Sequence, residues 1–284
     1  MARRRITEIP RSQLAVWARR LALFALVAAI LGTLIVRANL LEIVPALATV
    51  AGALALAGAA VLLAVGALVV IWKDGLDGLG SALTGMAVGL GLLAYPGYLA
   101  SQAYRLPAIN DITTDPADPP RLEALARVRP RQGNPATYPG AAVAAAQTAA
   151  YPDIEPLLLS AAPLAVYEAA YAVITKRKWR IVEARQPLPR PRRRDGHIEA
   201  VARTPIMGFR DDVVVRIRAE QDGARVDVRS ASRYGWHDLG TNAARVASLL
   251  EEIEAAVDAL PPARRSPEPP AQDEPSPRPP RARR

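Results

Sequence analysis

The chain of 284 residues contains no cysteine and only two histidines, and these absences exclude whole classes of chemistry. Without cysteine there is no thiolate nucleophile, no thiolate metal site and no disulfide bond. With His197 and His237 as the only imidazoles, a histidine-rich metal site within one chain is excluded as well. Asp111, Asp115, Asp211 and Asp212 could bind Ca²⁺ if the fold brought them together, but their spacing matches no known calcium loop. We therefore expect no metal and no other cofactor.

Lysine is also scarce, since only Lys73, Lys176 and Lys178 among the 36 basic residues are lysine. The basic excess over 27 acidic residues gives a net charge of +9 and a pI of about 10.3, which usually suggests a nucleic-acid partner. Here much of the excess lies in an N-terminal arginine cluster and in the tail after residue 263. Topology signals and lipid headgroup contacts explain such arginines more simply, so we expect the lipid bilayer and no nucleic acid as a partner.

Charge is missing altogether from three long runs, at residues 21–36, 43–72 and 79–99. About 20 apolar residues in a helix cross a hydrocarbon core of about 30 Å, so residues 1–104 are predicted to form an anchor of three transmembrane helices. Transporters usually need ionisable groups inside the membrane, and their absence favours an anchor. Ser81, Gly85 and Gly89, at four-residue spacing, predict close packing between the helices.

The first of these runs is short enough to be a cleaved signal peptide, but no small-residue cleavage site follows it and further spans come at once. Arginines precede this run at positions 3, 4, 5, 11, 19 and 20. Because short arginine-rich flanks stay cytoplasmic, three crossings place everything after residue 99 outside. The Ala-, Arg- and Pro-rich composition is typical of a GC-rich bacterium. The expected location is thus the bacterial inner (cytoplasmic) membrane, with a cytoplasmic N-terminus and a periplasmic C-terminal domain.

The exported part divides into three segments by composition. Residues 105–150 form a proline-rich extended segment, predicted to pack on the domain and to contain a weak helix at 141–150. Residues 151–260 are predicted to form an α+β domain. The tail, residues 261–284, has no apolar period and is predicted to be disordered.

The α+β domain is predicted to be an antiparallel meander of four strands flanked by two helices. The first helix, residues 160–178 with Ser160 as cap, shows an apolar stripe of Leu164, Tyr167, Tyr171 and Ile174. The last helix covers residues 242–260. Between them, alternation in strands 212–219 and 224–232 around an Asp-Gly turn predicts a hairpin with Arg218 opposite Asp227. Two helices should cover the apolar face of the sheet, and the other face should be wet.

Four polar segments carry a family resemblance: residues 110–115, 150–153, 208–213 and 229–245. Together they resemble the bacterial domain-of-unknown-function family numbered 1499, over about residues 109–260. The resemblance implies no catalytic residues, because the family has no assigned activity. It does imply that the proline-rich segment belongs to the domain, and the membrane part lies outside it.

Several polar residues of these segments are candidates for ligand binding. They are Arg210, Asp211, Asp212, Arg229, Arg233, His237, Asp238, Asn242 and Arg245. A helix that starts near Asn242 offers unpaired backbone donors, so Arg233 and Arg245 could hold an anion there. Alternatively, Asp238 or Asn242 caps the helix and the arginines pair with Asp211 and Asp212.

The sequence is compatible with two functions. The first is a non-enzymatic membrane-anchored domain that binds a partner protein, an envelope component or a small anion. The second is an envelope hydrolase that uses His237 and Asp238, with Ser232 as a further candidate. The missing cysteine nucleophile and the absence of a nucleophile-elbow pattern favour the first.

Overall fold

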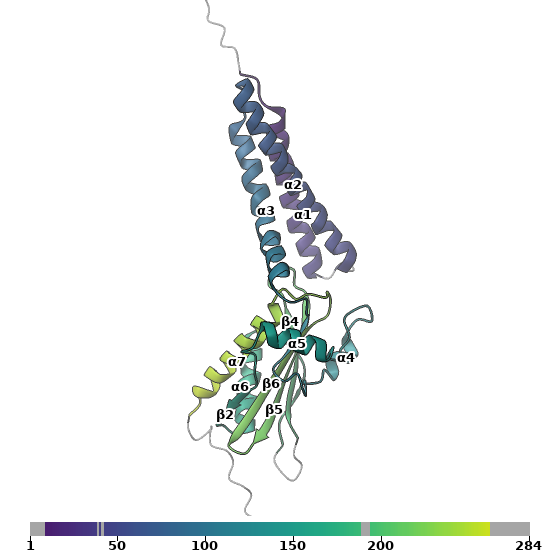
Figure 1. Ribbon diagram of the computed structural model, residues 1–284, viewed down its shortest axis with the longest axis vertical. Coiled ribbons are helices and arrows are strands. Elements are labelled where there is room, and N and C mark those ends of the chain that lie inside the picture. The colour runs from purple at the N-terminus through teal and green to yellow at the C-terminus, as the bar shows by residue number, and fades with distance from the viewer. Residues whose placement is uncertain (1–8, 39, 41–42, 189–193, 262–284) are drawn as a thin grey trace, which may run out of the picture. The chain divides into compact units, whose positions relative to one another are not determined.

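A computed structural model of the chain describes residues 9–38, 40, 43–188 and 194–261 (Figure 1). The tail predicted to be disordered lies outside these residues from position 262 onward, as do the first three arginines of the N-terminal cluster. The chain forms two compact units. Residues 1–110, 203–211 and 234–240 make up the helical unit; residues 111–202, 212–233 and 241–284 make up the sheet unit.

Three helices, each long and apolar enough to cross a membrane, form the helical unit. They are α1 (Gln13–Ala38), α2 (Ile43–Asp74) and α3 (Leu79–Arg105), and they run side by side in Figure 1. Alanines line their contacts, among them Ala15, Ala67 and Ala82, which are fully buried. The close packing predicted for α3 is confirmed, because a Cβ on Gly85 would lie 2.8 Å from the backbone carbon of Ala18 and one on Gly89 would lie 2.6 Å from Val61.

The two ends of the helical unit differ in their contacts. At one end the segment before α1 meets the α2–α3 loop: the amide of Ser12 donates to the carbonyl of Asp77, and Arg11 Nε lies 3.2 Å from the Asp77 carboxylate. At the end of α1, Arg37 donates to the carbonyl oxygens of Pro205 and Ile206. The basic N-terminal flank therefore gathers at the end of the bundle that also holds the α2–α3 loop.

The sheet unit contains the predicted meander together with two short strands that the pattern did not indicate. The sheet has the order β1-β6-β5-β4-β3, and β2 also pairs with β6. The strands are β1 (Asp111–Thr113), β2 (Leu157–Leu159), β3 (Arg180–Arg185), β4 (Gly196–Arg203), β5 (Arg210–Glu220) and β6 (Gly223–Ser232). The predicted fold class, a helical anchor plus an α+β domain, is confirmed.

The hairpin turn lies at Gln221 and Asp222, one residue before the predicted Asp-Gly turn, and Gly223 is the first residue of β6. Its φ is +153°, and a Cβ there would lie only 2.0 Å from the carbonyl oxygen of Leu159 in β2. Any side chain would push β2 away from β6. Arg218 Nη2 lies 2.9 Å from the Asp227 carboxylate, which also pairs with Arg216 and Arg225.

One face of the sheet is covered by α6 (Pro163–Lys176) and α7 (Thr241–Asp258). The stripe predicted for the first helix is partly wrong: Tyr167 and Ile174 are buried, but Leu164 and Tyr171 are more than 40% exposed. The buried face of α6 instead carries small residues, among them the fully buried Ala170, because these let the helix approach the sheet. Ser160 does not cap this helix, since Ala162 is its N-cap and no side chain bonds there.

The other face of the sheet is covered too, which corrects the expectation of a wet face. The cover segment, which we define as residues 111–140, crosses it and contains β1 and the short helix α4 (Ala124–Val128). Leu122 and Leu125 from this segment pack on Val201, Val214 and Ala231. The predicted helix at 141–150 is confirmed as α5 (Ala141–Ala150), and the side chain of Gln147 bonds both backbone groups of Thr113.

Candidate functional site

Asp212, a predicted ligand-binding residue, lies fully buried between two arginines. Its carboxylate accepts from Arg129 Nε at 2.6 Å and from Arg233 Nε at 2.9 Å. Arg129 also donates to three carbonyl oxygens, of Asn134, Pro135 and Ala231. The group is therefore a closed ion-pair triad that fastens the cover segment to β5 and β6.

Arg229 is bound in a similar way, with only 2% of its surface exposed. Its guanidinium donates two hydrogen bonds to the Asp111 carboxylate, from Nε at 2.9 Å and from Nη2 at 2.7 Å. It also donates to the carbonyls of Pro120 and Ala136, and it lies 5.6 Å from the ring centre of Tyr138. All these partners belong to the cover segment, so Arg229 anchors that segment to β6.

At the start of α7, Asn242 and Arg245 turn inward to the sheet. Asn242 bonds Ser230 at 2.7 Å and Ser232 at 2.9 Å, and Arg245 Nη1 donates to Ser230 at 2.9 Å. Asn242 is fully buried and Arg245 is 9% exposed. The Arg233–Asp212 pair agrees with the structural alternative, whereas these bonds of Asn242 and Arg245 run to serines of β6.

The remaining predicted residues, Arg210, Asp211, His237 and Asp238, belong to the helical unit. The Nδ1 atom of His237 accepts from the amide of Leu239 at 3.0 Å, and Asp238 Oδ1 accepts from the amide of Gly240 at 2.9 Å. Arg210 is half-buried and Asp211 is buried. These two bonds shape a turn in the loop, and the same loop also reaches the end of α3, since His237 Nε2 lies 3.3 Å from the carbonyl oxygen of Ala103.

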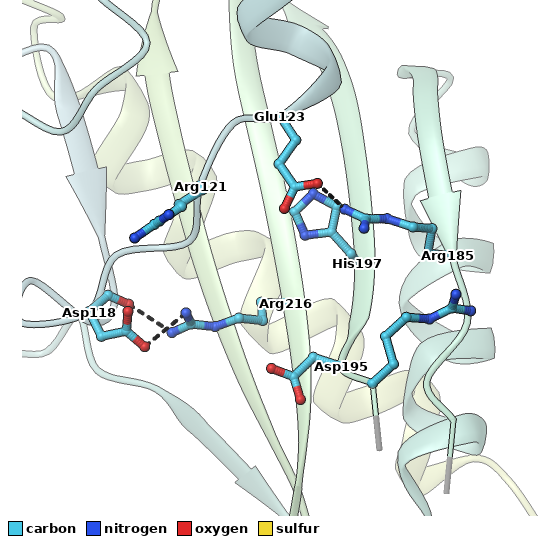
Figure 2. A pocket seen from close by; sticks show the side chains of 8 residues that line it. Asp118, Arg121, Glu123, Arg185, Asp195, His197 and Arg216 are labelled. Atoms are coloured by element: carbon cyan, nitrogen blue, oxygen red, sulfur yellow. Dashed lines mark hydrogen bonds and ion pairs between the residues drawn. The ribbon is translucent and has the colours of Figure 1, made fainter. Parts of the chain in front are cut away.

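Sequence reasoning missed a hollow of about 280 Å³ in the sheet unit, shown in Figure 2. It lies among the cover segment, β3, β5 and the start of β4. Its lining consists of Asp118, Arg121, Glu123, Arg185, Arg194, Asp195, His197 and Arg216. All eight side chains are polar, and seven of them are formally charged.

Two of the four arginines in this hollow are neutralised by carboxylates. Arg216 Nη1 lies 3.0 Å from Asp118, and Arg185 Nη2 lies 2.5 Å from Glu123 (Figure 2). The Arg194 guanidinium donates to the carbonyl of Gln186 at 3.2 Å. Arg121 is exposed and has no partner in the part of the chain that the structure describes. The hollow therefore carries positive charge that its own carboxylates do not fully balance.

His197 is buried among the residues that line the hollow, and a hydrogen bond to a buried carboxylate fixes the orientation of its ring. Its Nε2 lies 2.8 Å from Glu199, which is fully buried. Because a carboxylate can only accept, the proton of a neutral imidazole sits on Nε2, and Nδ1 keeps its lone pair. His197 can thus accept a hydrogen bond when neutral and donate one from Nδ1 when protonated.

Glu199 is in turn held by the first turn of α4. Its two carboxylate oxygens accept from the backbone amides of Glu123, Ala124 and Leu125 at 2.7, 3.0 and 2.6 Å. Burial alone would raise the pKa of Glu199, but the bonds from His197 and these amides outweigh it and lower the pKa. The carboxylate therefore stays charged and keeps His197 in place.

The sequence contains a signal for the contact between His197 and Glu199. Alternate residues of a strand point to the same face, so the order His-Ile-Glu at 197–199 places the imidazole and the carboxylate side by side. Nothing local indicates that the cover segment would bring backbone amides and an arginine to the same spot. In the described residues no group of three His, Asp or Glu side chains could hold a metal ion.

The three apolar helices and the covered six-stranded sheet define a membrane protein with an α+β domain. Residues 111–253 match the sequence profile of a family described as "Protein of unknown function (DUF1499)", and the chain belongs to this family. The suspected membership is thus confirmed, and the cover segment lies inside the match. A comparison with curated proteins gives no match.

The buried triad around Asp212 gives a first prediction. Asp212→Asn leaves the buried charges of Arg129 and Arg233 uncompensated, so it should lower the free energy of unfolding by about 3–5 kcal/mol. Glu252→Gln is the matched control, because its pair with Arg177 is 48% exposed on the Glu252 side and should contribute less than about 1 kcal/mol. Urea unfolding of the detergent-solubilised chain, followed by circular dichroism, measures both. Equal losses in the two variants would contradict the structural role of the triad.

Glu199 gives a prediction for pH. Since its pKa is lower in the folded protein than its ordinary value of 4.5, it stabilises the fold above that value and loses this effect as the pH falls through the folded pKa. The stability difference between the native chain and Glu199→Gln should therefore be largest at neutral pH and shrink in acid. Urea unfolding at a series of pH values checks this. A difference that stays constant into acid would show that Glu199 is not held as a carboxylate.

Proposed function

We propose that this protein is a multi-pass protein of the bacterial inner membrane whose DUF1499 domain faces the periplasm and binds a small anionic ligand. The binding site is the hollow lined by Arg121, Arg194 and His197. The observation that carries the proposal is the guanidinium of Arg121, which has no partner among the described residues and stands at a hollow where other arginines are already paired.

The charge pattern of the hollow supports an anion as the ligand. The Arg121 and Arg194 guanidiniums have no carboxylate bonded to them among the described residues, and the lining carboxylate of Asp195 has no arginine bonded to it there. The charge offered to a ligand is thus that of the Arg121 and Arg194 guanidiniums, since Glu183, Asp227 and Glu199 already bond the other lining groups. Guanidinium groups bind carboxylates and phosphates through charge-assisted hydrogen bonds, and these are about twice as strong as neutral ones.

His197 adds a second contact of different chemistry. Its proton on Nε2 is committed to Glu199, so Nδ1 is the ring nitrogen left to bind. A ligand that carries a hydroxyl group as well as an anionic group would find a hydrogen-bond partner in His197 in addition to the arginines of the lining. Three backbone amides hold Glu199 in place, and Glu199 holds His197. Less conformational entropy is therefore lost when His197 binds a ligand.

The orientation in the membrane rests on the arginine distribution. Arg11, Arg19 and Arg20 precede or begin the first helix, and Lys73 lies at the same end of the bundle, whereas Arg37 and Arg105 lie at the other ends of α1 and α3. The richer side is retained in the cytoplasm. An odd number of crossings then carries the sheet unit to the periplasmic side.

Ligand binding is tested with the full chain in an uncharged detergent, titrated calorimetrically with inorganic phosphate and with succinate. We expect saturable binding of at least one probe, weakened about tenfold by Arg121→Ala through loss of one charge-assisted hydrogen bond. Arg127→Ala is the matched control, since Arg127 on α4 is exposed, as Arg121 is, but does not line the hollow. No saturable binding of either probe, or equal weakening in both variants, would refute the site.

Orientation is tested with reporter fusions in bacterial cells. Alkaline phosphatase fused after the last residue should be active, because it folds only outside the cytoplasm. The same enzyme fused after Asp74, behind the second crossing, should be inactive, and green fluorescent protein should give the opposite pattern. Activity of the phosphatase at Asp74 but not at the C-terminus would reverse the topology.

A further inference from the structure

Two loops of the helical unit are bonded to the ends of membrane helices. In residues 234–240, the carbonyl of Gly235 accepts from Asn110 Nδ2 at 2.6 Å, and the amide of Asp238 donates to Ile109 at 3.0 Å. His237 Nε2 lies 3.3 Å from the carbonyl oxygen of Ala103. This loop is therefore fixed at the C-terminal end of α3.

The second loop, residues 203–211, is fixed at the end of α1. Arg37 donates to the carbonyl oxygens of Pro205 and Ile206, the latter at 2.9 Å. Gly208 has a φ of +70°, and a Cβ there would lie 3.2 Å from the Arg37 side chain. The turn thus closes tightly on an arginine that ends a membrane helix.

The depth of these contacts follows from helix geometry. The apolar run 79–99 rises about 32 Å, which matches the hydrocarbon core of about 30 Å. Residues 100–105 rise about 9 Å further, into the headgroup layer on that side. Ala103, which His237 contacts, therefore lies at headgroup depth.

Large exposed side chains accompany these contacts. Trp236 is 74% exposed, Tyr104 is 94% exposed and Ile206 is 42% exposed. Tryptophan and tyrosine gather at membrane interfaces, where the ring is apolar and its N–H or O–H stays wet. Trp236 also lies beside His237, with 5.9 Å between the ring centres.

We infer that residues 203–211 and 234–240 form a lipid-binding surface that rests in the headgroup layer, with Trp236 as its anchor. A bilayer is the occupant that the position favours, because both loops are bonded to the ends of helices that cross it. The inference does not depend on the hollow around Arg121, since it involves the helical unit alone.

Tryptophan fluorescence tests the inference in the full chain. The four tryptophans are Trp17, Trp72, Trp179 and Trp236. Replacing the first three by phenylalanine leaves Trp236 as the reporter, and replacing Trp17, Trp72 and Trp236 leaves Trp179 in the sheet unit as the matched control. Both chains are reconstituted into phosphatidylcholine vesicles whose acyl chains carry bromine, which quenches nearby indoles.

We expect Trp236 to be quenched severalfold more than Trp179, and more strongly by bromine near the headgroups than by bromine deep in the chains. Quenching of Trp236 no greater than that of Trp179 would overturn the inference. Strongest quenching by deep bromine would also overturn it, since the indole would then lie in the hydrocarbon core.

A second measurement covers the case in which a triple variant fails to fold. Trp236→Phe alone, in the otherwise native chain, should remove part of the emission that shallow bromine quenches. Trp179→Phe should leave that part unchanged, although it loses the stacking of Trp179 on Arg177 at 5.0 Å. An unchanged quenched share in Trp236→Phe would overturn the inference.

Discussion

The sheet unit depends on matching every charge that the cover segment buries. Strands β5 and β6 carry arginines and aspartates on the face opposite the helices, and such groups cannot be buried unless they are paired. The cover segment supplies the counter-charges: Asp111 for Arg229, Asp115 and Asp118 for Arg216 and its neighbours. Desolvation would raise the pKa of Asp115, but the amide of Asp118 and the charges of Arg225 and Arg218 outweigh it and lower the pKa.

The candidate binding site is a consequence of that arrangement. The cover segment reaches β4 with the first turn of α4, where Glu199 caps three backbone amides. The same carboxylate binds His197, so one buried group both fastens the segment and orients the imidazole. The hollow lies beside this attachment, with Asp118, Arg121 and Glu123 of the cover segment in its lining. Fold and candidate site are therefore coupled through Glu199.

Local patterns predicted the elements whose partners are close in sequence. The charge-free runs predicted three membrane helices, and alternation around Asp222 and Gly223 predicted the hairpin that brings Arg218 to Asp227. The burial of the second sheet face could not be predicted in this way. An outward Arg216 has the same local pattern whether water or Asp118, 98 residues away, is its partner. The hollow was missed for the same reason, since Arg121, Arg185 and Arg216 come from three distant segments.

The buried charges specify the position of the cover segment more than they add to its stability. A buried ion pair gives little net stabilisation, because desolvation offsets most of the attraction. A displaced segment, however, would leave Arg229 or Asp212 buried without a counter-charge, and that penalty is large. Apolar contacts alone, such as those of Leu122 and Leu125, tolerate a shift far more easily because they have no direction. The charges thus exclude other positions of the segment, and this selection is what holds the amides of α4 against Glu199 and the imidazole of His197 at the hollow.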